Sequence, residues 1–317
     1  MRPPRALLIS LAALALGAAT VATAAAPVAV KSSNRNEQAP AAGGEWFAWS
    51  KSRAKYPSPF DVWAQHLTEP AFKVNPRNTQ AYTGGVDGTR LVYQVLFNYG
   101  AAGSDLRLFD LALRRHVPLP AGVNTKRWEC CATLSGSWLL FSRGLAYSRY
   151  LQLVMLRNLV TGEERVLDRL VNKEGLLSAG QVSGNFAVWA KCNPYPRCQI
   201  SRHDIVAGTT TPLPVPAGKV AYSPSVTPLG TTYHGRSNPG CGRRVELVKQ
   251  PLVGAAQVLV ALPAGQDLDV TSALLDLGQP TGVTMAKVYY DRIICRTRAW
   301  DIFVVNDLER PPPPVTR

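Results

Sequence analysis

The sequence has few histidines and lacks the short motifs that mark common catalytic sites. Only four histidines occur in 317 residues. There is no Gly-x-Ser-x-Gly, no His-Glu-x-x-His and no phosphate-binding loop. We therefore predict no catalytic residue, no metal site and no cofactor, and the sequence favours a non-enzymatic protein.

Acidic residues and long apolar runs are also scarce. The chain carries 21 Asp and Glu against 35 Lys and Arg, a formal net charge of +14 at pH 7. Long apolar stretches are confined to the N-terminus, where a basic start, an Ala-rich run over 6–18 and Ala22-Thr-Ala24 form a secretory pattern. This predicts a signal peptide over 1–24 and a secreted or cell-envelope protein with no transmembrane segment after cleavage. Retention of the segment as an anchor is the alternative.

A helical apolar periodicity is missing from 43–308, where a repeat is present instead. Four times, a glycine precedes an aromatic residue by five positions, and the stretch between them is typical of a strand. Two further units are degenerate. The six aromatic positions are Trp49, Tyr93, Phe141, Trp189, Gly235 (where glycine replaces the aromatic) and Tyr290. This spacing predicts an all-β protein, a six-bladed β-propeller of four-stranded antiparallel blades over 43–308.

Two of these units resemble a known family. Val86–Tyr93 (VDGTRLVY) and Asp301–Leu308 (DIFVVNDL) resemble the repeats of TolB-like propellers, the PD40 or WD40-like class. The resemblance covers about 43–308 and does not include the N-terminal α/β domain of TolB. It implies the propeller fold and, because these repeats are structural, it implies no site residues.

The two ends of the repeat region raise the question of how the ring closes. Residues 309–317 form a Pro-rich tail, and proline is a poor strand residue because it cannot donate to a ladder. The segment 25–42 is a linker that contains Val28–Lys31, a possible ring-closing strand. We expect this strand to form the outer edge of the sixth blade, and a disordered linker is the alternative.

All six cysteines follow the signal segment, and an even number in an exported chain favours disulfides. Cys192 and Cys198 flank one loop between antiparallel strands, so we pair them. Cys241 and Cys295 fall in equivalent loops of adjacent blades and form a second expected pair. Cys130 and Cys131 remain, and a vicinal disulfide would complete the set.

Basic residues gather in the loops that join the second and third strands of each blade, and these loops should share one face. These loops contain thirteen basic residues and only one acidic residue, Asp291. Several tyrosines lie in the same loops. The expected binding residues are Lys51, Arg53, Lys55, Tyr56, Arg143, Tyr147, Arg149, Lys191, Tyr195, Arg197, Arg236, Arg243, Arg292, Arg296 and Arg298, with Arg244 in the same loops. Solvated loops of a generally basic protein are the alternative.

Such a face predicts a binding or scaffold module for an anionic partner. In an exported protein, an anionic glycan, an envelope polymer or an acidic protein is a better candidate than nucleic acid. The alternative function is a propeller hydrolase acting on a glycoside, ester or lactone in the central channel. Glu129 and Asp276 are the acids expected on the channel strands, and nothing in the sequence places them at a suitable distance for that chemistry.

Overall fold

The structure is a computed structural model that describes residues 26–31, 33, 35–54, 58–97, 103–145, 148–172, 174–194, 196–237, 243–276 and 284–309. The expected signal peptide (1–24) and the tail after Glu309 lie outside the described residues. Among the described residues, nothing helical could span a lipid bilayer.

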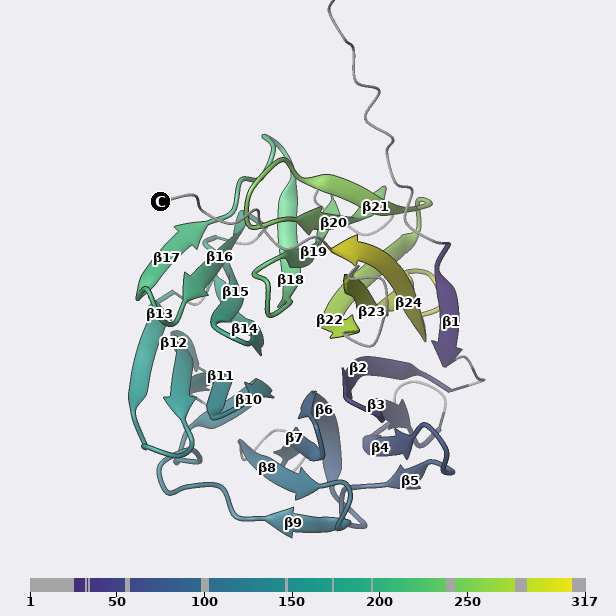
Figure 1. Ribbon diagram of the computed structural model, residues 1–317, viewed down its shortest axis with the longest axis vertical. Coiled ribbons are helices and arrows are strands. Elements are labelled where there is room, and N and C mark those ends of the chain that lie inside the picture. Colours follow the sequence, from purple (N-terminus) through teal and green to yellow (C-terminus); the bar gives the residue numbers. More distant parts are fainter. Residues whose placement is uncertain are drawn as a thin grey trace, which may run out of the picture.

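Six four-stranded antiparallel sheets are arranged around a central axis (Figure 1). Blade one contains β2 (Glu37–Gly43), β3 (Trp46–Ser52), β4 (Phe60–His66) and β5 (Phe72–Lys73). Blade two contains β6 (Gln80–Asp87), β7 (Arg90–Leu96), β8 (Ser104–Asp110) and β9 (Arg115–Val117). Blade three contains β10 (Trp128–Ser135), β11 (Trp138–Leu145), β12 (Ser148–Asn158) and β13 (Glu164–Leu170). The predicted six-bladed β-propeller is confirmed.

The remaining blades follow the same order. Blade four contains β14 (Leu176–Ser183), β15 (Phe186–Cys192), β16 (Cys198–Asp204) and β17 (Thr209–Pro212). Blade five contains β18 (Val220–Val226), β19 (Thr232–Ser237), β20 (Val245–Gln250) and β21 (Gln257–Leu262). Blade six contains β22 (Gln266–Asp276), β23 (Thr284–Ile294), β24 (Ala299–Glu309) and β1 (Val28–Lys31).

Strand β1 closes the ring. It pairs antiparallel with β24, Val28 opposite Val304, and forms the outer edge of blade six as the sequence predicts (Figure 1). The start of the propeller differs from the expected boundary at 43. Residues 37–43 form β2, the innermost strand of blade one, because this short Ala-rich stretch pairs with β3 and packs into the ring.

The second strand of each blade explains the aromatic repeat. Tyr93, Phe141, Trp189 and Tyr290 are almost completely buried between blades, because each strand places this position on a face covered by its neighbours. Such packing contributes most of the stability of a propeller, since a single four-stranded sheet cannot bury its own faces.

The six innermost strands share a second feature, a β-bulge at the same level. The bulge residues are Ala39, Gly84, Cys131, Gly180, Ser223 and Thr271, and all of them line the central axis. Glycine is required at two of these positions. A Cβ on Gly84 would lie 2.2 Å from the Ala132 carbonyl oxygen, and one on Gly180 would lie 2.3 Å from that of Pro224. Neighbouring inner strands therefore touch at the bulges.

The cysteines agree with the predicted pairing in part. Cys192 and Cys198 form the expected disulfide across the loop between β15 and β16. Cys295 is disulfide-bonded, while Cys241, its expected partner, lies outside the described residues.

The expected vicinal disulfide of Cys130 and Cys131 is wrong. The two thiols are free, with their Sγ atoms 2.7 Å apart, whereas the bonded pair at Cys192 is separated by 2.04 Å. The reason is the bulge in β10, where Cys131 adopts a φ of 56°. At this bulge the two side chains come close, but their Sγ atoms stay farther apart than the roughly 2.03–2.05 Å of a disulfide bond.

Candidate functional site

A cavity of about 650 Å³ lies on the propeller axis. It is lined mainly by residues from the starts of the innermost strands, such as Leu176, Val220 and Asp267. In an antiparallel blade these starts share one face with the loops between second and third strands. We call this the loop face, and the opposite face the turn face. The axial pocket therefore lies toward the loop face.

Small and hydroxyl-bearing side chains line most of the axial pocket. Asp267 and Asp269, on β22 of blade six, are the charged residues among those that line it in the described part of the chain. Tyr222 donates a hydrogen bond from its hydroxyl to Oδ1 of Asp267, and Ser223 donates one to Oδ1 of Asp269. Both donors belong to the bulged strand β18 of blade five. One wall of the pocket is thus an acidic cluster held by hydroxyl groups.

A third carboxyl stands behind this wall. Asp291 on β23 is directly opposite Asp269 in the strand register and is 2% exposed. Its Oδ2 accepts a hydrogen bond from the Ala39 backbone N–H at 2.9 Å, while its Oδ1 is buried without a hydrogen-bond partner. Burial, with the charge of Asp269 adding to it, raises the pKa of Asp291 well above its usual value. Burial likewise raises the pKa of Asp269, and Asp267 adds to the shift.

The degenerate fifth repeat has a direct effect on this wall. Gly235 stands where the other blades carry a buried aromatic side chain. The ring of Tyr222 occupies the space instead, because a Cβ on Gly235 would lie 2.7 Å from Cε2 of Tyr222. The missing aromatic on β19 is therefore replaced by one from the innermost strand, and its hydroxyl reaches the acidic wall.

Sequence reasoning missed Asp267 and Asp269 and expected Glu129 and Asp276 at the channel. Glu129 is fully buried away from the pocket and accepts a hydrogen bond from Nε of Arg143 at 3.2 Å. The side chain of Asp276 lies outside the described residues. Strand β22 starts at Gln266, so the innermost strand of blade six begins well before Asp276 and contains the two acids that line the pocket. The alternation of Asp267 and Asp269 with Leu268 and Val270 is the period-two signal that could have extended the strand.

Most described bases of the expected basic face form ion pairs with carboxylates of the propeller strands. The ion pairs are Lys51–Glu37, Arg53–Asp61, Arg143–Glu129, Lys191–Asp168, Arg236–Glu246 and Arg292–Asp301. Arg143 is almost fully buried and also donates to the carbonyl oxygens of Gly122 and Val123. Because Arg143 is buried among these hydrogen-bond partners, its guanidinium group cannot contact a partner outside the protein. Lys55, Tyr56, Tyr147 and Tyr195, and the side chain of Arg149, lie outside the described residues.

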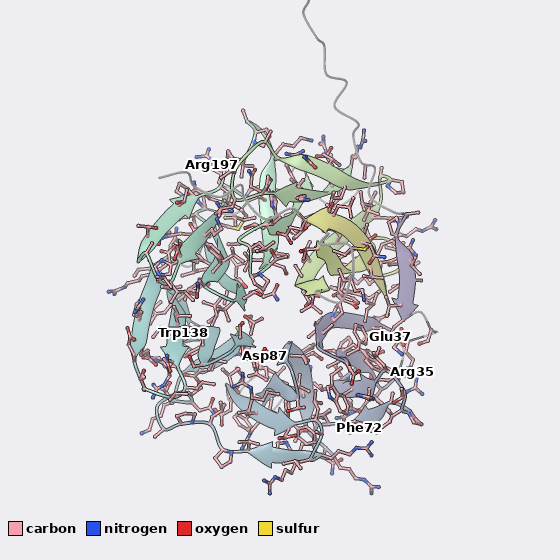
Figure 2. All side chains as sticks on the ribbon, in the orientation of Figure 1. Arg35, Glu37, Phe72, Asp87, Trp138 and Arg197 are labelled. Atoms are coloured by element: carbon pink, nitrogen blue, oxygen red, sulfur yellow. A yellow bond between two sulfur atoms is a disulfide. The ribbon has the colours of Figure 1, made fainter. Side chains whose placement is uncertain are left out.

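A smaller group of bases on the loop face is exposed. Arg197, Arg243, Arg244 and Arg296 are solvent-exposed and form no ion pair within the described part of the chain. They come from equivalent loops of blades four, five and six. Arg197, labelled in Figure 2, extends into solvent from the loop that the Cys192–Cys198 disulfide closes. We call these four residues the arginine group. Arg298 is exposed in the same region.

The arginine group and the axial pocket are adjacent in the fold. Cys198 and Val245 line the pocket and directly follow Arg197 and Arg244. Ile293 also lines the pocket and lies three positions before Arg296. The loop face thus combines exposed positive charge on three blades with a pocket whose charged lining is acidic. This arrangement can bind a charged ligand at either position.

No protein-family model and no curated protein matches this chain. Solved propeller structures are similar in fold. A puromycin hydrolase matches with a TM-score of 0.50 and 12% identity over 85% of this chain and 47% of its own. TolB from Acinetobacter baumannii matches with a TM-score of 0.49 and 11% identity over 78% of this chain and 60% of its own. An oligogalacturonate lyase in complex with manganese matches with a TM-score of 0.49 and 13% identity, over 84% and 76%.

The match to the puromycin hydrolase agrees with the propeller architecture that the strand order gives. The chain spans less than two thirds of the length of the puromycin hydrolase and TolB chains. At such low identity the comparisons show the propeller fold and no particular family or activity.

Proposed function

We propose that this chain is an exported, non-enzymatic β-propeller that binds an anionic partner through the arginine group of blades four to six. The observation that carries the proposal is that Arg197, Arg243, Arg244 and Arg296 are exposed without an ion pair in the described structure. Most of the other described bases on this face are neutralised by carboxylates. The propeller scaffold presents the four side chains from equivalent loops of consecutive blades.

The chemistry of arginine indicates the class of partner. The guanidinium group is permanently charged and binds carboxylate or phosphate through two parallel hydrogen bonds. Loops on neighbouring blades suit a partner with repeated negative charges, such as an anionic glycan, an envelope polymer or an acidic protein surface. Because the arginines are solvent-exposed, we expect the interaction to weaken as ionic strength increases.

A matched pair of variants tests this proposal. Arg243→Ser with Arg244→Ser removes two neighbouring charges from the loop face, and Arg114→Ser with Arg115→Ser removes two neighbouring exposed charges from the turn face. Each protein is used to capture partners from the envelope fraction of the producing cell. We expect the loop-face variant to lose an anionic partner that the wild type and the turn-face variant both retain. Equal capture by both variants would contradict the proposal.

A second candidate function is hydrolysis of a glycoside, ester or lactone in the axial pocket. The observation that favours it is the pair of carboxyl groups of Asp267 and Asp269 on the pocket wall, because glycoside hydrolysis is commonly carried out by two carboxyl groups. Turnover of chromogenic glycosides or esters by the wild type, abolished by Asp269→Asn, would support this function.

A further inference from the structure

We propose that the axial pocket binds a protonated amine, held by Asp269 and Asp267. The inference concerns a different position from the arginine group and a ligand of opposite charge. It therefore goes beyond the proposed function and does not depend on it.

The first argument is uncompensated charge. Asp267 and Asp269 line the pocket, Asp291 stands directly behind them, and none of the three forms an ion pair with a base in the described structure. Carboxylates placed together in a partly dry site repel each other and lose hydration, so a cation between them is strongly favoured. The pocket therefore has the charge of a cation site.

The second argument is an unsatisfied buried atom. Oδ1 of Asp291 is buried and has no hydrogen-bond partner, although the side chain is only 2% exposed. Buried polar atoms are almost always hydrogen-bonded, and an exception needs an explanation. Because Asp291 and Asp269 are register partners across β22 and β23, this atom belongs to the same carboxyl cluster. A hydrogen-bond donor that reaches the cluster, either a bound proton or a ligand cation, would give this buried oxygen a partner.

The third argument is that the wall is built for a ligand. The Tyr222 hydroxyl donates to one oxygen of Asp267, and the Ser223 hydroxyl donates to one oxygen of Asp269. These hydrogen bonds orient the two carboxylates. The second oxygen of Asp269 makes no hydrogen bond to a described residue, so it can accept one from a ligand. Tyr222 reaches its position only because Gly235 lacks a side chain. The one blade that breaks the aromatic repeat is therefore the blade that arranges this wall.

Pocket size and lining favour an organic ammonium over a metal ion. The described residues contain no group of three or more His, Cys, Asp or Glu arranged to hold a metal. An ammonium group brings three N–H donors, which match carboxylate and hydroxyl acceptors. The cavity of about 650 Å³ has the size of small-molecule pockets, and Val220, Val245 and Ile293 can contact an alkyl chain. The amine can come from a free alkylamine or from a lysine side chain.

Calorimetric titration of the whole mature protein tests the proposal. The probes are n-pentylamine, its neutral counterpart 1-pentanol, and Nα-acetyl-lysine amide as the lysine source. We expect the amines to bind and the alcohol to bind on the order of 10-fold more weakly, because charge-assisted hydrogen bonds are lost. Tighter binding of one amine identifies its source. Binding of alcohol and amine with equal affinity, or no amine binding, would overturn the proposal.

Three variants locate the site. Asp269→Asn should reduce amine affinity on the order of 10-fold or more. Asp267→Asn should also reduce amine affinity, and it tests the site if the first variant unfolds. Asp87→Asn removes the same charge at the end of β6 on the turn face and should bind as the wild type does (Figure 2). A melting curve of each variant establishes folding. Unchanged amine binding in both folded pocket variants would also overturn the proposal.

Proton release gives a readout that a merely structural role would not produce. An ammonium beside Asp269 favours ionisation of the neighbouring carboxyls, so binding should release protons where those carboxyls still hold them. Titrations in two buffers of different ionisation enthalpy measure this release. The Arg243 and Arg244 double variant should keep amine binding, so failure of the arginine proposal and failure of the amine proposal are separate outcomes.

Discussion

Arg143 and Arg197 were expected to act together at the loop face, but their surroundings differ. Arg143 is buried, and its guanidinium contacts Glu129, Glu164 and two backbone carbonyls. Arg197 is exposed in the loop before β16. Their positions along the repeat are similar, and the partner acid of Arg143 comes from the neighbouring strand. The pairing of strands decides which basic side chain has a carboxylate partner. The positions of the basic residues in the sequence do not reveal this pairing.

This difference gives the first prediction. Arg143→Ala should lower the free energy of unfolding by about 3–5 kcal/mol, because it leaves Glu129 buried without its counter-charge. Arg197→Ala should change it by less than about 0.5 kcal/mol, as exposed substitutions usually do. Urea denaturation of both variants measures the difference. Similar losses in the two variants would show that Arg143 is not held in a buried network.

Asp291 gives a pH-dependent prediction. Its pKa in the folded protein is raised well above the usual 3.8, so between these two values the folded chain binds a proton that the unfolded chain has released. The free energy of unfolding should therefore fall as the pH rises from about 3.8 to the raised pKa of Asp291. At pH values above that pKa, the whole of this loss in stability persists. Asp291→Asn can still accept the Ala39 hydrogen bond, so it should be more stable than the wild type at neutral pH.

The measurement is thermal unfolding of wild type and Asp291→Asn across this pH range. The wild-type melting temperature should decrease relative to that of the variant as pH rises. A constant difference between wild type and Asp291→Asn at all pH values would contradict the predicted titration.

Among the strands, the sequence predicted the repeating elements better than their irregularities. The aromatic positions of Tyr93, Phe141 and Trp189 identified the second strands, because the same burial recurs in each blade. The bulges of the inner strands were not predicted. They arise from close contact between neighbouring blades, as at Gly84 and Gly180, and that contact exists only after the ring has formed.

Gly180 provides a prediction at this scale. A methyl group there would lie 2.3 Å from the carbonyl oxygen of Pro224 on the next inner strand, and backbone cannot move aside as a side chain can. Gly180→Ala should therefore lower the free energy of unfolding by about 1–3 kcal/mol or more. Gly144→Ala on β11, where the nearest atom is 3.3 Å away, is the matched control and should cost less. Urea denaturation compares them, and a larger loss at Gly144 would contradict the close approach at the bulge.

For the whole molecule, the sequence was sufficient to predict the number of blades and the strand that closes the ring. It was not sufficient to predict the site, because the site depends on contacts between blades that are far apart in sequence. Gln181 illustrates this point. Its side chain accepts hydrogen bonds from the backbone N–H groups of Val226 and Ala273, and so joins the inner strands of blades four, five and six. No local pattern around 181 indicates such a bridge.

Ring closure by β1 gives the last prediction. Removing residues 26–31 from the chain would leave the 11-residue strand β24 as an unpaired edge, open to pairing with another molecule. The loss of this pairing should lower the melting temperature, by about 2–4 °C for each kcal/mol of stability lost. The variant should also associate increasingly as its concentration rises, which size-exclusion chromatography detects. Lys31→Ala, which removes one cation over the ring of Trp49 and keeps the strand, is the control and should remain closed. An unchanged melting temperature and no association in the truncated chain would mean that the ring is held by the contacts between its inner strands, and that β1 only covers the edge of blade six.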